Sequence, residues 1–358
     1  MRLLHCFSLI LCMILLLLQT AHAANHAVIL LYHHVDNETL DSTSVSTQLF
    51  TQHINYLKRN RMHVISLSAL LRSLKAGEEL PEHTVVITFD DAYHSLQQHA
   101  LPLLKKEGLP FSIFVNPGTI DKKYGGYMNW QSLRETLTYG GEVLNHGTTH
   151  THMVRKLHSE SDHQWQTRIT HEIEYAQKRL EQEIGTSERI FSYPYGEFNF
   201  ALQDIITKLG YTAVGQQSGA VDAYSNPTAL PRFPIMGSYA ETEPFTLRLN
   251  SRPLPVSPSQ SIDHLLSPLN RQPKLHLQLA QGGYDKQRIQ CYFRETPLAI
   301  QWQNSAHTSF EITSPIPLSS GRNKYTCTAP SLTTQGVYYW YSHLWILANE
   351  DASWPKEQ

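Results

Sequence analysis

Val-Val-Ile-Thr-Phe-Asp-Asp, residues 85–91, is a short apolar run of mainly β-branched residues that ends in two adjacent carboxylates. Such a run is typical of a buried strand. Charged groups beside a core are costly unless they are paired or bind a metal ion. The stretch therefore predicts a central strand whose carboxyl end, at Asp90 and Asp91, carries the chemistry of the protein.

A pair of histidines follows these carboxylates at a spacing that suits a metal site. His146 and His150 lie in Asn-His-Gly-Thr-Thr-His, residues 145–150. Two histidines and one carboxylate form a three-ligand set for a catalytic zinc ion with one coordination position left open. The second carboxylate, Asp90, is then free to act as a base. The alternative interpretation is that these groups are loop caps and ordinary polar loop residues.

The N-terminal 23 residues have the features of a secretory signal. Arg2 supplies the positive region, residues 6–18 form an apolar stretch, and Ala-His-Ala at 21–23 is a cleavage site. The apolar stretch is too short to span a bilayer comfortably, and an uncleaved membrane anchor is the alternative. We therefore expect an exported protein, periplasmic or secreted, with no stable membrane span after cleavage.

The mature chain is expected to be nearly neutral and to carry one disulfide. Cleavage removes one arginine and no acid, which leaves 28 basic and 31 acidic residues and a net charge of −3. This balance argues against nucleic acid as the main partner. Cys291 and Cys327 form an even pair in an exported chain, which favours a disulfide between them over two separate buried thiols.

Apolar strand-like runs alternate with helical patterns up to about residue 244. The predicted strands are 27–32, 85–89, 111–116, 142–145, 190–193 and 211–215, and the longest predicted helix runs from Trp165 to Ile184. This alternation predicts an α/β fold with a parallel sheet and helices outside it, open or closed into a barrel. Functional residues of such folds lie at the carboxyl ends of the strands, where both carboxylates and the first histidine fall.

The pattern changes after residue 244. Residues 245–273 are rich in proline and serine and predict a linker. Period-two runs follow at 275–279, 288–293, 299–303 and 337–346, which predicts a β-sandwich. Aromatic residues alternate along the last run, so half would face the sandwich core and half would bind glycan or dock on the first domain. The expected organisation is a signal at 1–23, an α/β domain at 24–244, a linker at 245–273 and a sandwich at 274–358.

Three segments, in this order, resemble the polysaccharide deacetylases, carbohydrate esterase family 4, which are also called NodB-homology enzymes. They are Thr-Phe-Asp-Asp at 88–91, His-Gly-Thr-Thr-His at 146–150 and Tyr-Pro-Tyr-Gly at 193–196. Residues 31–35 and 230–235 are similar to the branch that includes poly-β-1,6-N-acetylglucosamine deacetylases. The resemblance covers roughly residues 26–238. It implies a distorted (β/α)7-type barrel, here followed by the smaller all-β sandwich.

The resemblance also implies an activity and residue roles. The activity is hydrolysis of N-acetyl groups on a β-linked N-acetylglucosamine polymer, with a divalent metal that is most often zinc. Asp90 would be the base for the activated water. Tyr195 would stabilise the oxyanion through its backbone N–H, and Pro194 before it would fix the shape of that loop. The metal ligands would be Asp91, His146 and His150.

Two departures from the family pattern leave roles open. The family commonly has an arginine two residues before the proline of its third motif, to orient the base, and Ser192 stands there. Arg232 is a candidate to reach Asp90 from another loop. The late Leu-His motif that supplies the general acid has no clear match, and the candidates are His33, His34 and His264. We favour His33, because the end of a barrel strand faces the site.

Other candidates have ordinary alternatives. Trp130 is a candidate to stack on sugar, although core packing is the more common role of a tryptophan. Tyr195 could instead be a simple turn aromatic. His152 and His158 are expected to face solvent, because a catalytic zinc site needs only three protein ligands.

Two further functions stay in view at this point. One is a glycan-binding protein that keeps the fold without catalysis, and the other is a different zinc amidohydrolase that acts on a small amide or a peptide-linked sugar. The appended β-domain favours a polymer substrate, because such a module holds a long chain near the site and raises its effective concentration.

Overall fold

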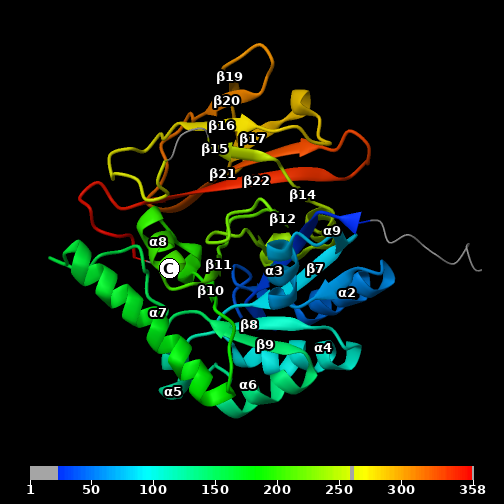
Figure 1. Cartoon of the computed structure of the whole chain (residues 1–358), viewed down its shortest axis with the longest axis vertical. Helices are drawn as coiled ribbons and strands as arrows, with labels where there is room; N and C mark the ends of the chain where they lie inside the picture. The colour runs from blue at the N-terminus through cyan, green and yellow to red at the C-terminus, as the bar shows by residue number, and fades with distance from the viewer. Residues whose placement is uncertain (1–22, 259–261, 357–358) are drawn as a thin grey trace, which may run out of the picture.

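The computed structural model describes residues 23–258 and 262–356. It places an α/β region below two β-sheets formed by the C-terminal part of the chain (Figure 1). The predicted signal lies almost entirely outside the described residues. Within the described ranges, no helix has both the length and the apolar character needed to cross a membrane.

Nine strands form the central sheet of the α/β region. β11, β10, β9, β8, β7 and β2 lie side by side in that order and pair in parallel. All six predicted strands are present, within one residue of the predicted bounds at each end, whereas β5, β12 and β13 were not predicted. The nine strands are β2 (His26–Tyr32), β5 (His63–Ile65), β7 (Thr84–Phe89), β8 (Phe111–Val115), β9 (Gly141–Asn145), β10 (Ile190–Ser192), β11 (Thr212–Val214), β12 (Val221–Asp222) and β13 (Phe233–Pro234).

Burial on both faces explains the continuous apolar runs of β2 and β7. Every residue of β7 is buried. Val85, Ile87 and Phe89 pack with the helices on one face, and Val86 packs with Ile29 on the other. Strands covered on both sides have no need for an alternating polar pattern. The same alternation brings Thr88 and the following Asp90 to the inner face of the curled sheet.

Residues 230–234 join the two edges of this sheet. Leu230 pairs with Val214 at the end of β11, and β13 pairs with β2 at the opposite edge. The sheet therefore curls into a distorted barrel, and Arg232 lies in the segment that closes it. The predicted (β/α) barrel architecture is confirmed.

The helices lie outside the sheet because each has an apolar face. Phe50, Ile54 and Leu57, together with His53, form the buried face of α2. The long helix α7 begins with a capping box between Ser161 and Gln164 and ends before Gly185. The helices are α2 (Thr47–Arg59), α3 (Leu67–Ala76), α4 (Leu101–Glu107), α5 (Pro117–Asp121), α6 (Trp130–Thr136), α7 (Asp162–Ile184), α8 (Phe200–Lys208) and α9 (Thr242–Leu249).

Two sheets form the C-terminal all-β region. One has the order β14-β22-β21-β17-β18 and the other β15-β16-β20-β19. Cys291 and Cys327 form a disulfide between directly opposite residues of β17 and β21. The strands are β14 (Arg252–Pro253), β15 (Val256–Pro258), β16 (Leu275–Leu279), β17 (Gln290–Phe293), β18 (Thr296–Leu298), β19 (Gln301–Trp302), β20 (Ser309–Ile312), β21 (Gly321–Pro330) and β22 (Tyr338–Leu347).

Two parts of this region differ from expectation. β18, β20 and β21 lie in stretches where no strand was predicted. The segment 245–273, expected as a linker, contains most of α9 together with β14 and β15. The prolines are compatible with these short elements, because proline is tolerated at the first turn of a helix and in edge strands. β14 and β15 are both edge strands.

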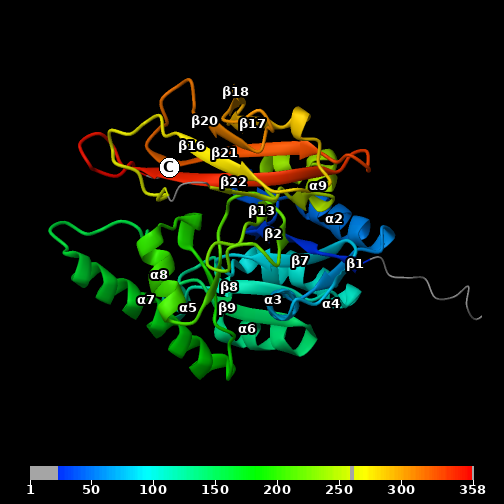
Figure 2. The ribbon, with the colours of Figure 1, turned by 45° about the horizontal axis from the view of Figure 1, so that its top comes forward.

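The strand β22 faces both parts of the molecule. It lies along the top of the α/β region (Figure 2). Tyr339 and Trp345 point into the core between the two β-sheets, whereas Leu344 and Ile346 pack with apolar residues of the α/β region. Trp340 meets Phe233 edge-on, with ring centroids 5.4 Å apart. The aromatic residues of β22 that face away from the sandwich core, Trp340 among them, therefore contribute to packing between the two regions.

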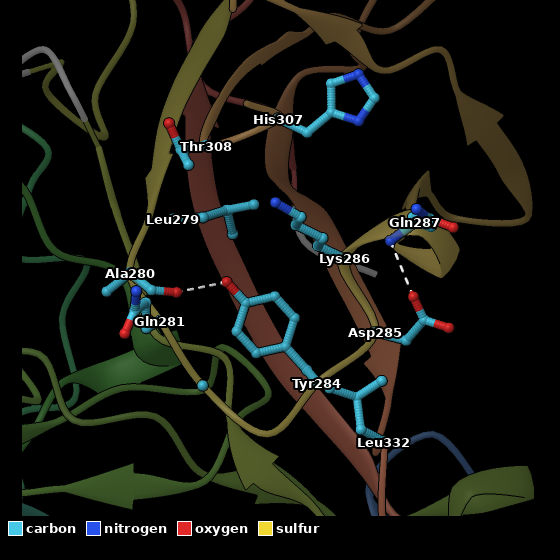
Figure 3. Close-up of a pocket in the computed structure, with 11 residues that line it drawn as sticks. Leu279, Ala280, Gln281, Tyr284, Asp285, Lys286, Gln287, His307, Thr308 and Leu332 are labelled. Atoms are coloured by element: carbon cyan, nitrogen blue, oxygen red, sulfur yellow. Dashed lines mark hydrogen bonds between the residues drawn. The ribbon is translucent and has the colours of Figure 1, made fainter. Parts of the chain in front are cut away.

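A cavity of about 670 Å³ lies in the all-β region (Figure 3). Its lining includes Leu279, Tyr284, Lys286 and His307. Tyr284 donates a hydrogen bond to the Ala280 carbonyl and is itself buried. The ring is thus committed to the fold and is not an exposed platform for a ligand.

Candidate active site

The two carboxylates diverge directly after β7 because the backbone turns there. Asp91 and Ala92 have φ values of 73° and 54°, in the left-handed region that residues other than glycine rarely adopt. His150 also lies in that region, with a φ of 54°. Unfavourable backbone conformations persist only where the surroundings hold them, and they are common at functional sites. The turn directs Asp90 inward and Asp91 toward the loop after β9.

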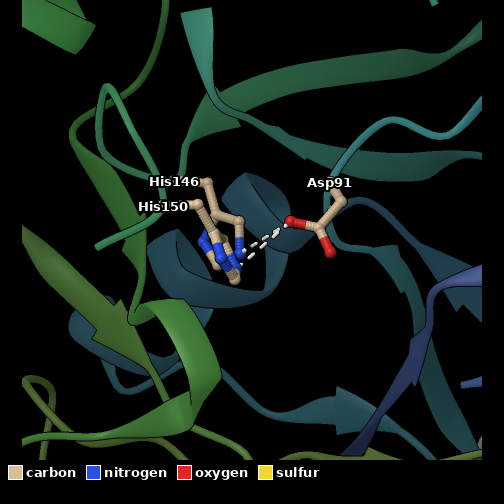
Figure 4. A group of neighbouring side chains, drawn as sticks. All are labelled: Asp91, His146 and His150. Atoms are coloured by element: carbon tan, nitrogen blue, oxygen red, sulfur yellow. Dashed lines mark ion pairs between the residues drawn. The ribbon is translucent and has the colours of Figure 1, made fainter. Parts of the chain in front are cut away.

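Asp91, His146 and His150 form a compact group, which we call the histidine cluster (Figure 4). The nearer Asp91 oxygen lies 3.5 Å from His146 Nε2 and 3.3 Å from His150 Nε2. One ligand atom from each residue lies within 4.8 Å of the other two. His146 is fully buried and follows β9, while His150 is partly exposed. The histidine cluster is therefore closed to solvent on the side of His146 and accessible on the side of His150.

Hydrogen bonding fixes the tautomer of His146. Its Nδ1 lies 2.7 Å from the carbonyl oxygen of Ser192, which can only accept, so Nδ1 carries the proton. Burial lowers the pKa of His146 to about 4, although the charges of Asp90 and Asp91 oppose that effect. The ring is therefore neutral at pH 7. Its Nε2 presents a lone pair toward Asp91.

This arrangement fits a divalent metal ion. A lone pair on His146 Nε2 and a carboxylate oxygen of Asp91 are both acceptors, and they face each other at 3.5 Å. A cation between them would satisfy both groups at once. One carboxylate and two imidazoles are a common ligand set for catalytic zinc, and a carbonyl bond to the second ring nitrogen is the usual support. The residues predicted as ligands are thus brought together by the fold.

Asp90 belongs to a second group, the arginine cluster, with Thr88, Ser192 and Arg232. Arg232 Nη1 donates to one oxygen of Asp90 at 2.8 Å, and Nη2 donates to the other at 2.7 Å. Ser192 donates to the same carboxylate at 3.2 Å. Asp90 and Arg232 are both fully buried. The contact proposed from the sequence between Arg232 and Asp90 exists, and Ser192 contributes a hydroxyl in place of the missing arginine.

The arginine cluster keeps Asp90 ionised. Burial alone would raise the pKa of this carboxyl, but the positive charge of Arg232 and its two hydrogen bonds outweigh burial. The pKa of Asp90 therefore lies well below its usual range. Asp90 also lies 4.0 Å from His146 Nε2, so it borders the histidine cluster. An ionised acceptor thus lies beside the candidate metal position.

The third motif forms a short turn beside His150. Pro194 is buried, and Tyr195 has φ 60° and ψ 3°. The Tyr195 ring stacks on His152 with centroids 3.7 Å apart and contacts His150 at 4.4 Å. Tyr195 is therefore a neighbour of the metal position, and its role in stabilising an oxyanion stays a proposal.

The candidate general acids lie in different places. His33 follows β2 near both carboxylates, and its Nδ1 has no hydrogen-bond partner among the residues that the structure describes. Burial lowers the pKa of His33, while the charges of Asp90 and Asp91 oppose this. His34 stacks on Tyr93 at 3.6 Å. His264 bonds the Leu344 carbonyl at the boundary with the all-β region. Of the three, His33 and His34 border the site.

The contacts found for Trp130 are with residues outside the histidine cluster. Its Nε1 donates to Asp121 at 2.8 Å, and the guanidinium of Arg179 lies 5.4 Å from its ring centroid. These partners belong to α5 and α7, and the ring also packs against the main core cluster. The observed contacts are those of packing at the base of α6.

His152 corrects an expectation. It was expected to face solvent, but it is part-buried, stacks on Tyr195 and lies 2.9 Å from the buried carboxylate of Glu197. Arg155 donates to the other oxygen of Glu197 at 3.1 Å. His158 is exposed, as expected. His152 and Glu197 are 45 residues apart, so only the fold shows that they are in contact. The position of Glu197 directly after the third motif could have indicated that this acid lies near the site.

Comparisons with known proteins agree with this geometry. Residues 77–214 match the family model described as polysaccharide deacetylase. The chain carries a polysaccharide deacetylase domain. Members of this family are hydrolases that act on amide bonds. The matched residues include the histidine cluster, Asp90 and the third motif.

Two relatives share a name. A poly-β-1,6-N-acetyl-D-glucosamine N-deacetylase of Staphylococcus aureus (strain MSSA476) is 25% identical over 210 residues, which are 57% of this chain and 72% of the relative. The protein of the same name from Escherichia coli (strain K12) is 22% identical over 246 residues, which are 58% of this chain and 36% of the relative.

Solved structures show the same fold. The Streptococcus pyogenes deacetylase PplD in complex with acetate aligns with a TM-score of 0.57 and 20% identity, over 63% of this chain and 98% of that chain. IcaB from Ammonifex degensii aligns with a TM-score of 0.54 and 22% identity, over 61% of this chain and 95% of that chain. At this identity the likeness establishes the fold of the deacetylase domain.

Proposed function

We propose that this chain is an exported, metal-dependent deacetylase that hydrolyses N-acetyl groups of a β-linked N-acetylglucosamine polymer. The observation that carries the proposal is the junction of the two clusters. A compact set of one carboxylate and two imidazoles, Asp91, His146 and His150, borders a buried carboxylate, Asp90, that Arg232 keeps ionised. Binding of glycan alone would not require this pair of arrangements.

Asp91, His146 and His150 would hold the metal. When bound, the ion supplies a Lewis acid that polarises the acetyl carbonyl and makes water acidic enough for a weak carboxylate base. The carbonyl oxygen of Ser192 accepts a hydrogen bond from Nδ1 of His146, so the proton stays on Nδ1 and Nε2 keeps its lone pair. A ring fixed in this tautomer needs no proton loss before it binds a cation.

Asp90 would accept a proton from the attacking water. Its low pKa keeps it in the accepting form throughout the neutral range, and Arg232 holds both of its oxygens in place. A base in a fixed orientation lowers the entropic part of the barrier. Tyr195 would direct its backbone N–H to the oxyanion of the tetrahedral intermediate.

His33 is the proposed proton donor to the leaving amine. It lies close enough to Asp90 and Asp91 for both charges to act on its ring, and its Nδ1 is not engaged by a described residue. Because burial lowers its pKa, His33 is mostly neutral at pH 7. It would therefore have to gain its proton during the reaction, before it protonates the amine.

Poly-β-1,6-N-acetylglucosamine is the proposed polymer, because the relatives described above are named for it. The proposed location is the periplasm or the cell exterior, as the N-terminal sequence predicts. Zinc is the proposed metal, given the ligand set.

The test is acetate release from β-1,6- and β-1,4-linked N-acetylglucosamine oligomers by the purified protein. Release that a chelator stops and zinc restores would support the proposal, and the preferred linkage would identify the polymer. Absence of release from both sets, with zinc bound, would contradict it and favour a glycan-binding role or a different amide substrate.

A further inference from the structure

The loop that carries Tyr195 holds two successive residues in left-handed conformations. Tyr195 has a φ of 60° and Gly196 a φ of 67°. Glycine suits its position, because a Cβ there would lie 2.6 Å from Cβ of Gln216. A tyrosine gains no such benefit, so its left-handed conformation persists only where contacts hold it. The contacts that hold Tyr195 therefore shape the loop.

One of these contacts comes from the all-β region. Arg322 Nη1 donates a hydrogen bond to the carbonyl oxygen of Tyr195 at 2.6 Å. The guanidinium also lies 5.6 Å from the centroid of the Tyr195 ring. The ring is held on other sides by His150 and His152. The same residue of the all-β region thus contacts both the backbone and the side chain of Tyr195.

Arg322 is directed at the loop by the alternation of β21. Asn323, Tyr325 and Cys327 are buried within the all-β region, so the residues between them point to the other face, toward the deacetylase domain. The disulfide at Cys327 ties β21 to β17.

The strand beside Arg322 packs against the deacetylase domain. Arg322 is opposite Ile346 in β22, and Ile346 packs in one cluster with Tyr193 and Phe198. These two residues flank the loop on either side. The strand that carries Arg322 is therefore fixed against the base of the loop that it contacts.

We propose that Arg322 is a positioning residue for the backbone N–H of Tyr195. The inference rests on the proposed function, in which that N–H stabilises the oxyanion. The angles φ and ψ together set the direction of a residue's N–H relative to its own carbonyl, and at Tyr195 they are 60° and 3°. Arg322 anchors the Tyr195 carbonyl, so it holds this pair of angles and thereby the direction of the N–H. The all-β region then completes the site of the neighbouring domain.

The test compares three variants of the purified protein. Arg322→Met removes the donor and keeps most of the apolar stem, Arg322→Lys keeps a charged donor, and Arg288→Met is the matched control on an exposed arginine of the same region. Three quantities are measured: steady-state acetate release from N-acetylglucosamine oligomers, bound zinc, and hydrogen–deuterium exchange of the backbone amides of residues 193–198 and of β7.

Arg322→Met is expected to lower kcat by about 10- to 100-fold, with KM changed less than about 3-fold, because one misplaced oxyanion donor weakens binding of the transition state and not of the ground state. Bound zinc should stay at the wild-type level. Exchange in residues 193–198 should be at least about 5-fold faster, whereas exchange in β7 should not change. Arg322→Lys should recover part of kcat, and Arg288→Met should behave as wild type.

A wild-type kcat in Arg322→Met would overturn the inference and leave the proposed function intact. So would a reduced kcat with unchanged exchange in the loop. If the wild-type protein released no acetate, the proposed function would fail, and the exchange measurement would still decide whether Arg322 holds the loop.

Discussion

Asp90 and Asp91 are neighbours in the chain, yet they lie in two regions of the site with opposite partners. Asp90 enters the arginine cluster, where a guanidinium occupies both of its oxygens. Asp91 enters the histidine cluster, where two imidazole nitrogens lie 3.5 Å and 3.3 Å from one of its oxygens. The φ of 73° at Asp91 separates the two directions. Identical side chains thus receive different tasks from the backbone turn and from their partners.

The largest effect should come from the histidine cluster. Asp91→Asn and His150→Ala each remove one of three ligands, so we expect bound zinc to fall to background and activity to fall by at least about 10³-fold. Metal content by mass spectrometry and acetate release measure the two effects. Asp121→Asn, an exposed carboxylate on α5, is the control. Full zinc content in both variants would show that these residues are not the ligands.

The arginine cluster should affect stability as well as rate. Arg232→Met leaves Asp90 as a buried and unpaired charge, which costs about 3–5 kcal/mol in the free energy of unfolding. Arg232→Met combined with Asp90→Asn should recover part of that loss but no activity. Urea denaturation of the single and double variants tests this. An unchanged midpoint in Arg232→Met would mean that the ion pair does not stabilise the barrel.

His33 should matter less than either cluster. His33→Ala is expected to lower kcat by about 10²-fold while zinc content stays normal, because a proton donor contributes through the reaction and not through metal binding. His158→Ala, on an exposed histidine, is the control. Wild-type rates in His33→Ala would move the proton donor elsewhere, with His34 as the next candidate.

The smallest effect concerns Lys324, which β21 directs toward the deacetylase domain. Burial, together with the charges of Arg322 and Arg248, lowers the pKa of Lys324 to about 8. Below pH 8 the lysine is charged in both folded and unfolded protein, so folding bears the full cost of burying the charge. Above pH 10.5 it is neutral in both states and that cost vanishes.

Lys324→Met should therefore stabilise the protein at pH 7 by about 1–3 kcal/mol, allowing for partial solvent screening. The gain should shrink as the pH rises from 8 to 10.5. Thermal unfolding across that range measures it, with Lys75→Met on an exposed face of α3 as the control. A gain that does not depend on pH would point to packing and not to charge.

Much of the deacetylase domain could be predicted because its signals are local. β7 is a run of β-branched residues buried on both faces, and His146 directly follows β9. The residues of the histidine cluster, proposed as metal ligands, were predicted from residue type, spacing and the resemblance to the family. The contact between Arg232 and Asp90 was also predicted, because Ser192 stands where the family commonly has an arginine and Arg232 was a candidate to replace it.

The rest depends on contacts between distant segments. β21 was missed because its outward residues, Arg322 and Lys324 among them, are polar and face the other region of the protein, so the strand lacks an apolar pattern. The burial of His152 depends on Glu197, which only the fold brings close. The proline-rich stretch after residue 244 has the pattern of a linker, because short elements between prolines give weak signals.

The most direct test of the central claim separates the tasks of the two neighbouring carboxylates. Bound zinc and acetate release would be measured together in the wild-type protein, in Asp90→Asn and in Asp91→Asn. The account predicts that Asp90→Asn keeps its zinc and loses activity, whereas Asp91→Asn loses both. Normal activity in Asp90→Asn, or loss of zinc from both variants alike, would contradict the division of roles between the arginine cluster and the histidine cluster.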